Sequence, residues 1–520
     1  MNNAVPRTLV LLSTLTVLTQ SAFSQTWERE DVTFPSIESR AKDLANKPYV
    51  APDKGGLPDW MKNLSYDQYR DIRFNPDQAL WAADKLPFRA MLFHPGYIYN
   101  EPVRLNEFTG THTQRIRLAE AFFNYGPLVK KHGDLPADGG FAGFRLHAPL
   151  NNEYYDELAV FQGASYWRAL GKNQRYGISA RGIAVDTGSE GVQEEFPQFR
   201  EFWLRKPDAN DKSATVFAVL DGPSYTGAYS FKIEPGDDTT VNVTAVLFAR
   251  KEVKRLGIAP MSSMFWFGEN SRRRFDDFRP EVHDSDGLSI RMSTGERLWR
   301  PITNDTDKLE FSFFEMEKCE GFGLLQRDRR FSAYEDAEAN YHLRPSLWIE
   351  PTSDWGSGRV MLMEIPTKNE LADNVVALWE PKDTPKAGDR VEFSYKQHWT
   401  VAEDPSMAGG RVIATRTGLH DWQPEQRTVA VEFAGPNLEK PDEKPLQAMV
   451  QGVGPNAEKI KISGVAVQKL PENRWRVGFQ VSPAAEGGKL AEVGQVELRC
   501  SLRRGESEFL TETWVYRINP

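Results

Sequence analysis

The chain of 520 residues carries a formal net charge of −9, and a chain of this length is expected to fold as two or more domains. No basic stripe accompanies that acidic balance, so nucleic acid is excluded as a partner, because phosphate backbones would be repelled. The eight histidines and two cysteines show no CxxC or HExxH spacing, and the phosphate-loop pattern is absent. We therefore expect neither a metal site nor a cofactor.

The first residues have the pattern of a secretory signal peptide. Arg7 supplies the positive charge, Leu9 to Leu18 form a short apolar run, and Ala22-Phe23-Ser24 fits the small-x-small cleavage rule. We predict a signal peptide over residues 1–24 and a mature chain that begins at Gln25. The apolar run is too short for a comfortable membrane span, so we expect an exported, soluble protein.

Helices are predicted only in the first part of the mature chain. Apolar residues at Ile37, Ala41 and Leu44 indicate a helix over residues 36–45, and the capping box Ser65–Gln68 begins a second short helix. From about residue 85 onward, short runs of β-branched and aromatic residues are broken by Gly, Pro, Asn and Asp, as around Thr240–Phe248. The predicted fold class is all-β, a sandwich or barrel of many short strands.

A domain boundary is predicted in the turn-rich stretch Ala402–Gly410. Downstream of it the strands alternate cleanly, as in Val429–Phe433 and Trp475–Val481. We predict a large antiparallel β-sandwich over residues 25–403, a linker over 404–411, and a small β-sandwich of Ig-like size, about 110 residues, over 412–520.

The two cysteines, Cys319 and Cys500, could form a disulfide in an exported protein. However, Cys500 alternates with Leu498 and Leu502, so its side chain should point into a core. A free, buried thiol at Cys500 is the preferred prediction.

The stretch Arg279–Leu288 is unusually rich in charge, with three acidic groups, a histidine and an arginine between apolar segments. Such charge is costly to bury unless it is paired. The stretch is either an exposed turn or the lining of a cleft that presents carboxylates for acid–base chemistry. His283 is expected to be a hydrogen-bonded structural histidine.

Other conspicuous side chains have an ordinary explanation from their residue type. Core packing is the default for the tryptophans, and pairing with an acidic neighbour is the default for Arg168 and Arg181. Asp373, just before the apolar run Val375–Leu378, could cap a turn through an Asx hydrogen bond.

Several motifs resemble those of the periplasmic glucans biosynthesis proteins G and D: Phe161–Trp167, Ser179–Gly182, Arg279–Leu288, Gly321–Arg327 and Glu364–Trp379. The resemblance runs from about Val32 to Tyr516. It implies a large galactose-mutarotase-like β-sandwich followed by an Ig-like domain. It also implies a periplasmic role in making osmoregulated glucans, whose backbone is β-1,2-linked glucose. Members of this family are similar to endo-β-1,2-glucanases that act with inversion. The N-terminal segment has no twin-arginine pair, which disfavours a D-type protein exported by the twin-arginine route. The choice between the G and D types stays open.

The positions of the family's general acid and general base can be identified in this sequence from the motifs around them. The resemblance implies that Asp373, in the Asp-Asn pair after Glu-Ile-Pro-Thr, is the general acid. It implies that Asp284, which follows His in Pro-Glu-x-His-Asp-Ser, is the general base; Asp286 and Asp354 are the runners-up. Inverting carboxylates usually stand roughly 6.5–9.5 Å apart, or farther if protons travel through water or a sugar hydroxyl. The acid needs an apolar surround or a neighbouring carboxylate, for which the candidates are Glu364, Glu370 and Trp379.

The predicted substrate-binding residues come from separate motifs. Aromatic faces stack on the apolar face of glucose, and polar groups at the rim bind its hydroxyls. The predicted set is Trp167, Arg181, Trp266, Asp286, Tyr334 and Trp379.

Two functions from different classes follow. The first is an inverting endo-β-1,2-glucanase. The second is a non-catalytic module that binds β-1,2-glucan and guides the growing chain from a membrane glucan glucosyltransferase. A homodimer is a further assembly that the resemblance leaves open.

Overall fold

The computed structural model describes residues 27–52, 56–136, 138–304, 307–402, 409–420, 422–439, 444–505 and 510–518. The predicted signal peptide and most of the predicted linker lie outside these residues. No helix among the described residues is long and apolar enough to cross a membrane.

The predicted N-terminal helices are confirmed. Helix α1 (Phe34–Ala45) begins two residues earlier than predicted, because Thr33 and Ser36 form a capping box ahead of it. Its buried side chains, Ile37 and Ala41, pack on the outer face of the larger sheet. The capping box at Ser65 begins α3 (Tyr66–Arg70), as predicted. The other short helices are α2 (Asp59–Lys62), α4 (Phe331–Tyr334) and α5 (Leu490–Val493).

The larger sheet runs through the whole molecule, and its described strands are mostly antiparallel. In order across the sheet they are β1 (Glu28–Arg29), β5 (His112–Ile116), β4 (Arg104–Phe108), β12 (Gln198–Arg205), β13 (Ala214–Asp221), β14 (Tyr225–Glu234), β15 (Thr239–Ala249), β26 (Arg390–Thr400), β23 (Ser346–Pro351), β22 (Gly321–Leu325), β19 (Gly287–Arg291), β20 (Arg297–Pro301), β33 (Thr513–Ile518), β32 (Val496–Arg504) and β29 (Leu446–Val453).

A second antiparallel sheet packs against the first. Its order is β21 (Glu310–Met316), β24 (Gly358–Glu364), β25 (Val375–Pro381), β16 (Leu256–Ser263), β10 (Ser179–Arg181), β9 (Tyr166–Ala169), β8 (Asp156–Gln162), β7 (Gly143–Ala148) and β3 (Arg89–Phe93), with β11 (Ile183–Val185) also paired to β16. Aromatic side chains fill the space between the sheets: the rings of Phe161 and Trp167 lie 5.1 and 5.0 Å from that of Phe231. The predicted all-β fold class is confirmed.

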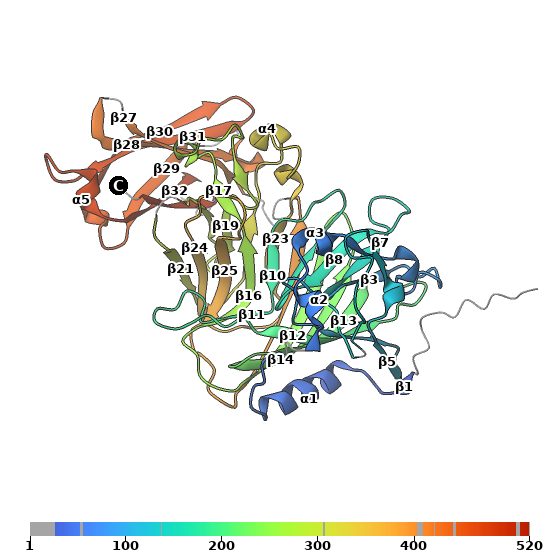
Figure 1. Cartoon of the computed structure of the whole chain (residues 1–520). Coiled ribbons are helices and arrows are strands. Elements are labelled where there is room, and N and C mark those ends of the chain that lie inside the picture. Colours follow the sequence, from blue (N-terminus) through green and yellow to red (C-terminus); the bar gives the residue numbers. More distant parts are fainter. Residues whose placement is uncertain are drawn as a thin grey trace, which may run out of the picture.

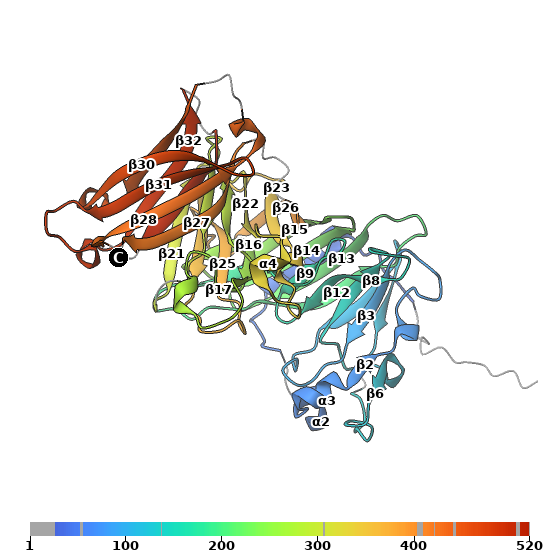
Figure 2. The same ribbon diagram turned by 90° about the horizontal axis from the view of Figure 1, so that it is seen from above.

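Downstream of the predicted linker, strands gather at one end of the molecule (Figures 1 and 2). A separate sheet of β27 (Arg411–His420), β28 (Gln423–Ala434), β31 (Arg474–Pro483) and β30 (Ile460–Leu470) shares a second core with β32 and β33. However, β33 also pairs in parallel with β20, so the larger sheet is continuous across the predicted boundary. The division into domains at residues 403 and 412 stays a prediction.

The cysteines agree with the sequence analysis. Both Cys319 and Cys500 are free and buried. Burial raises the pKa of the Cys319 thiol to about 12, and it also raises the pKa of Cys500. The prediction of a free, buried thiol at Cys500 is therefore confirmed.

Two small pairs of strands complete the fold. The first, β2 (Ile72–Phe74) with β6 (Phe123–Tyr125), lies beside the N-terminal helices. The second pairs β17 (Phe265–Phe267) with β18 (Val282–His283), which lies within the charge-rich stretch and ends directly before Asp284.

Candidate active site

Asp284 follows β18, and its backbone N–H donates to the carbonyl of Met264 at 2.8 Å. The residue is only 3 % exposed. Arg344 Nη1 donates to its Oδ1 at 2.5 Å. Burial raises the pKa of Asp284 above the usual value, while the Arg344 guanidinium acts in the opposite direction. A side chain at Gly177 would meet both Arg344 and the Asp284 carboxyl carbon, so this glycine allows their close packing.

Asp373 lies at the end of the loop that joins β24 to β25, and its side chain is 33 % exposed. Ser179 Oγ donates to Asp373 Oδ2 at 3.3 Å, and Arg168 Nη2 lies 3.9 Å from the same oxygen. These three side chains line one wall of a cavity of about 310 Å³. A molecule in that cavity can reach the Asp373 carboxylate directly.

The fold brings Asp284 and Asp373 into one electrostatic neighbourhood, although they are far apart in the sequence. The negative charge of Asp373 contributes to raising the pKa of Asp284, and the positive charge of Arg168 acts against it. One carboxylate is therefore buried and ion-paired, and the other is open to the cavity. The two environments differ in the way that acid–base chemistry requires.

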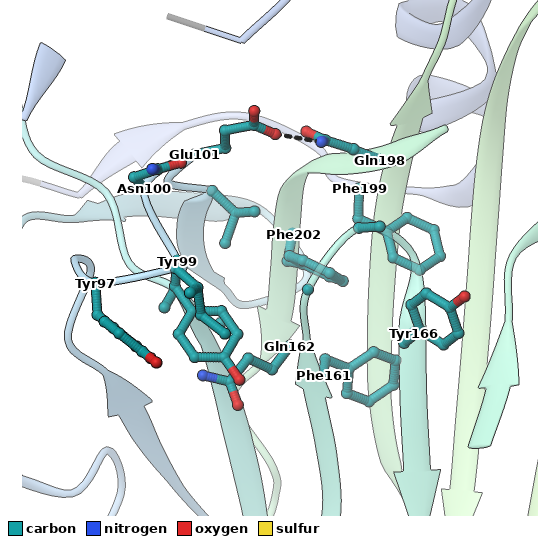
Figure 3. A pocket seen from close by; sticks show the side chains of 16 residues that line it. Tyr97, Tyr99, Asn100, Glu101, Phe161, Gln162, Tyr166, Gln198, Phe199 and Phe202 are labelled. Atoms are coloured by element: carbon teal, nitrogen blue, oxygen red, sulfur yellow. Dashed lines mark hydrogen bonds between the residues drawn. The ribbon is translucent and has the colours of Figure 1, made fainter. Parts of the chain in front are cut away.

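A second cavity, of about 430 Å³, adjoins the first, because both are lined by Tyr99, Gln162 and Tyr166. Figure 3 shows Tyr97 and Tyr99 on one side of it and Tyr166 on the other. All three tyrosines are partly exposed. The sequence analysis missed Tyr97 and Tyr99; the available signal was a Tyr-x-Tyr pattern in a stretch between Gly96 and Pro102.

The predicted stacking surface is wrong for Trp167, Tyr334 and Trp379, which are 1 % exposed or less. Strand β9 explains the error at Trp167. Successive side chains of a strand point to opposite faces, so Trp167 is buried in the core while Tyr166 and Arg168 are partly exposed on the opposite face.

The buried rings have partners of their own within the protein. Trp167 Nε1 donates to Gln397 Oε1 at 2.9 Å. Trp379 packs against Trp355, and the hydroxyl of Tyr334 donates to the carbonyl of Asp328 at 3.1 Å.

Neither Arg181 nor Trp266 lines the two cavities. Arg181 is 3 % exposed and donates to Glu194 Oε1 at 2.7 Å, and its guanidinium lies 5.8 Å from the ring centre of Tyr166. The predicted acidic partner of Arg181 is thus confirmed, and a direct sugar contact is not supported. Trp266 is partly exposed and packs edge-on against Phe275.

His283 is a hydrogen-bonded histidine, as predicted. Its Nε2 lies 2.8 Å from Glu281 Oε2 and 3.3 Å from Asp286 Oδ1, and its Nδ1 lies 2.8 Å from Gln326 Oε1. Burial alone would lower its pKa, but Asp286 and Glu281 outweigh burial and raise the pKa to about 9. Arg279, Glu281, His283 and Asp284 are all buried, so the exposed-turn interpretation of this stretch is wrong.

Asp286 belongs to this histidine cluster. It also accepts the backbone N–H groups of Arg327 and Asp328. These contacts do not support the prediction that Asp286 binds substrate. Glu281, His283 and Asp286 place possible metal-ligand atoms within 4.8 Å of one another.

The predicted neighbours of Asp373 also need correction. Glu364 is buried and binds Arg300 and the Thr303 backbone, each at 2.9 Å. Glu370 binds Arg279, and Trp379 lies in the core. The carboxylate that shares the electrostatic neighbourhood of Asp373 is instead Asp284.

The site thus combines a β-sandwich, cavities lined by tyrosines, a reachable aspartate and a buried, ion-paired one, an arrangement suited to a polar, ring-shaped ligand. Comparison with known proteins identifies the family. The family described as "Periplasmic glucan biosynthesis protein, MdoG" matches residues 33–518. The chain belongs to this family.

Relatives of known name agree with that assignment. The chain is 42 % identical to a glucans biosynthesis protein G of Bradyrhizobium diazoefficiens over 98 % of both chains. It is 45 % identical to one of Ralstonia nicotianae over 93 % of this chain and 95 % of the relative. It is 42 % identical to one of Vibrio cholerae over 92 % of this chain and 85 % of the relative.

Solved structures are more distant. A galactose mutarotase related enzyme from Lactobacillus acidophilus covers 51 % of this chain and 97 % of its own, at 10 % identity and a TM-score of 0.22. The Slr1438 protein from Synechocystis covers 50 % of this chain and 91 % of its own, at 8 % identity and a TM-score of 0.23.

Proposed function

We propose that this chain is a periplasmic, inverting endo-β-1,2-glucanase of osmoregulated glucan biosynthesis, with Asp373 as general acid and Asp284 as general base. The observation that carries the proposal is that Asp373, which lines the 310 Å³ cavity, shares one electrostatic neighbourhood with the buried, ion-paired Asp284. Hydrolysis needs a proton on the leaving glycosidic oxygen and an activated water on the opposite face of the sugar. The periplasmic location rests on the signal-peptide pattern and on the family.

Asp373 suits the acid role because it is reachable. A general acid must come within hydrogen-bond distance of the leaving oxygen, and Asp373 opens onto the 310 Å³ cavity. Ser179 and Arg168 hold the same carboxylate oxygen and so orient the carboxyl group.

Asp284 suits the base role because burial and the Arg344 ion pair shift its pKa in opposite directions. The Arg344 ion pair favours the carboxylate, while burial raises the pKa and so makes the carboxylate a stronger proton acceptor than one in water. Because Asp284 is buried, we propose that it receives the proton through a water molecule or a sugar hydroxyl rather than from the attacking water itself.

The glucan chain is proposed to lie along the adjoining cavities. Tyr97, Tyr99 and Tyr166 replace the tryptophans of the sequence analysis as the stacking surface. We further propose that a membrane glucan glucosyltransferase supplies the glucan. A homodimer stays a prediction.

The proposal is tested by incubating the purified protein with linear β-1,2-glucan and measuring release of reducing ends. Internal cleavage is expected, with products that first appear as the α-anomer in ¹H NMR spectra. Linear β-1,3- and β-1,4-glucans are the controls and should not be cut. An absence of cleavage of β-1,2-glucan at every pH between about 4 and 8 would contradict the proposal.

One observation favours the second candidate, a glucan-binding module without activity. The ion pair of Asp284 with Arg344 stabilises the carboxylate against taking up a proton. A binding module would retain affinity for β-1,2-glucan in calorimetry while releasing no reducing ends.

The pH dependence of the reaction is expected to depend on Arg344. The base works only when deprotonated, so activity should fall as the pH falls through the raised pKa of Asp284. Arg344 lowers that pKa, so Arg344→Met should raise it and move the acidic limb of kcat/KM to higher pH. The measurement is a pH–rate profile of both proteins.

Arg344→Lys is the matched control, because it keeps the positive charge and should shift the limb less. An acidic limb at the same pH in the parent and in Arg344→Met would show that Asp284 is not the group that titrates.

A further inference from the structure

We propose that Arg279 is a positioning residue that clamps the Asp373 loop to the segment that holds Asp284. We define the Asp373 loop as residues 365–374, between β24 and β25. This inference rests on the proposed function, because it assigns Arg279 a task in the same reaction.

The Asp373 loop needs an anchor. Much of it is exposed, and Leu371 is 86 % exposed. The base of the loop is tied by Asn374, whose side chain bonds the backbone of Phe265 and of Ile365 at 2.8–3.0 Å. The backbone of Thr367 exchanges two hydrogen bonds with the Asn304 side chain, each 3.1 Å long. Glu370, three residues before Asp373, also reaches back to the protein.

Arg279 grips Glu370 with both terminal nitrogens. Its Nη1 donates to Oε2 at 2.8 Å and its Nη2 to Oε1 at 3.2 Å, which is the bidentate arrangement that fixes a carboxylate in direction as well as in distance. The same guanidinium binds Asp277 at 2.9 Å and Asp336 at 2.8 Å. Arg279 is therefore itself held by two groups outside the loop.

A series of contacts continues from Glu370 to Asp284. The Tyr341 hydroxyl donates to Glu370 Oε2, the Arg344 guanidinium lies 4.3 Å from the centre of the Tyr341 ring, and Arg344 donates to Asp284. An unbroken series of contacts thus links the loop of the proposed acid to the proposed base. Arg279 is not among the residues that line the two cavities, so it acts through other residues.

Arg279 supplies the positive charge that holds three neighbouring carboxylates together. One guanidinium serves three carboxylates, and hydrogen bonds from Arg279 lower the pKa of Asp277. Without the guanidinium, Asp277, Asp336 and Glu370 would repel one another. That repulsion would move the Asp373 loop away from the rest of the site.

The first test is kinetic. Arg279→Met should lower kcat on β-1,2-glucan by about 10²-fold with little change in KM, because a misplacement of about 1 Å costs that much. Arg279→Lys should recover part of the loss, since it restores the charge but not the bidentate contact. The matched control is Arg359→Met, which removes an arginine with a bidentate grip on Glu380 elsewhere in the second sheet and should leave kcat unchanged.

The second test measures how firmly the Asp373 loop is held, and it does not depend on hydrolysis of glucan. Lys368 is exposed within the Asp373 loop, so trypsin cleavage after Lys368, followed by mass spectrometry, reports how firmly the loop is held. Arg279→Met should be cut there at least about tenfold faster than the parent and the Arg359→Met control, because proteolysis follows local opening. If Arg279→Met does not fold, Glu370→Gln takes its place, because it keeps an acceptor for Tyr341 and removes only the charge.

The outcomes separate the clamp from the proposed function. A lower kcat together with faster cutting supports the clamp. Unchanged cutting overturns it, whatever the kinetics, and so does a rise in KM at constant kcat. If the parent cleaves no glucan, the proposed function fails, and the trypsin result alone decides: faster cutting supports the clamp and unchanged cutting overturns it.

Discussion

Asp373→Asn is expected to lower kcat on β-1,2-glucan by about 10²–10⁴-fold, the usual worth of general acid catalysis, while KM changes far less. The substitution keeps the shape of the side chain and removes the proton. Neutral sugars bind mainly through stacking and hydroxyl contacts, so affinity should survive. Initial rates from reducing-end release give kcat, and calorimetry with a β-1,2-gluco-oligosaccharide gives affinity.

The acid role has a sharper signature than a low rate. A 2,4-dinitrophenyl leaving group departs without a proton, so Asp373→Asn should hydrolyse an oligosaccharide carrying that group nearly as fast as the parent does. Asp354→Asn is the matched control, because Asp354 is an exposed aspartate whose carboxylate accepts the Gly356 backbone N–H in a turn. Full activity of Asp373→Asn on natural glucan would exclude Asp373 as the acid.

Asp284→Asn is expected to lower kcat by a similar factor, about 10²–10⁴-fold, but for the opposite reason. An amide cannot accept the proton that the attacking water loses, which in the parent reaches Asp284 through a water molecule or a sugar hydroxyl. A better leaving group does not replace that proton acceptor. The variant should therefore remain slow on the dinitrophenyl substrate, which distinguishes it from Asp373→Asn.

Folding must be checked for Asp284→Asn, because the substitution removes the charge that Arg344 faces in a buried pair. Near-ultraviolet circular dichroism and glucan affinity close to those of the parent would establish an intact site. If such a protein cleaved glucan at close to the parent rate, the base would have to be sought elsewhere.

The fold class and helices α1 and α3 could be predicted from sequence because local rules decide them. The capping box at Ser65 marks the start of α3 in the sequence, whereas the one at Thr33 was not recognised, so α1 begins two residues earlier than predicted. Frequent turns between short alternating runs indicated a sandwich or barrel. The hydrogen bonds of His283 followed from the density of charge around it.

The stacking surface was predicted wrongly because residue type was given more weight than strand period. In β9 the pattern Tyr166-Trp167-Arg168 already assigns the tryptophan to one face and its neighbours to the other. Which face meets the core was not visible in that segment. In β25 the side chains around Trp379 are buried on both faces, so alternation gave no signal.

The pairing of Asp284 with Asp373 could not be derived from local pattern. It depends on strand order: β16 lies between β10 and β25, and β17 follows directly from β16. This arrangement brings Ser179, Asp373 and Asp284 to one end of the second sheet. Only the resemblance to a family indicated Asp284 and Asp373 as a pair, and it did not indicate where either side chain lies.

The parallel pairing of β33 with β20 has a consequence for how this protein must be made. Leu298 and Trp299 in β20 are matched to Thr513 and Trp514, so the larger sheet has an unfinished edge until the segment around residue 513 arrives. Trp299 also belongs to the second core and would be left uncovered. An open strand edge beside a bare tryptophan invites association with other chains. A chain shortened before Thr513 should therefore aggregate even though the cavities and both aspartates lie within the part that remains, and the upstream sandwich should depend on the downstream strands for its solubility.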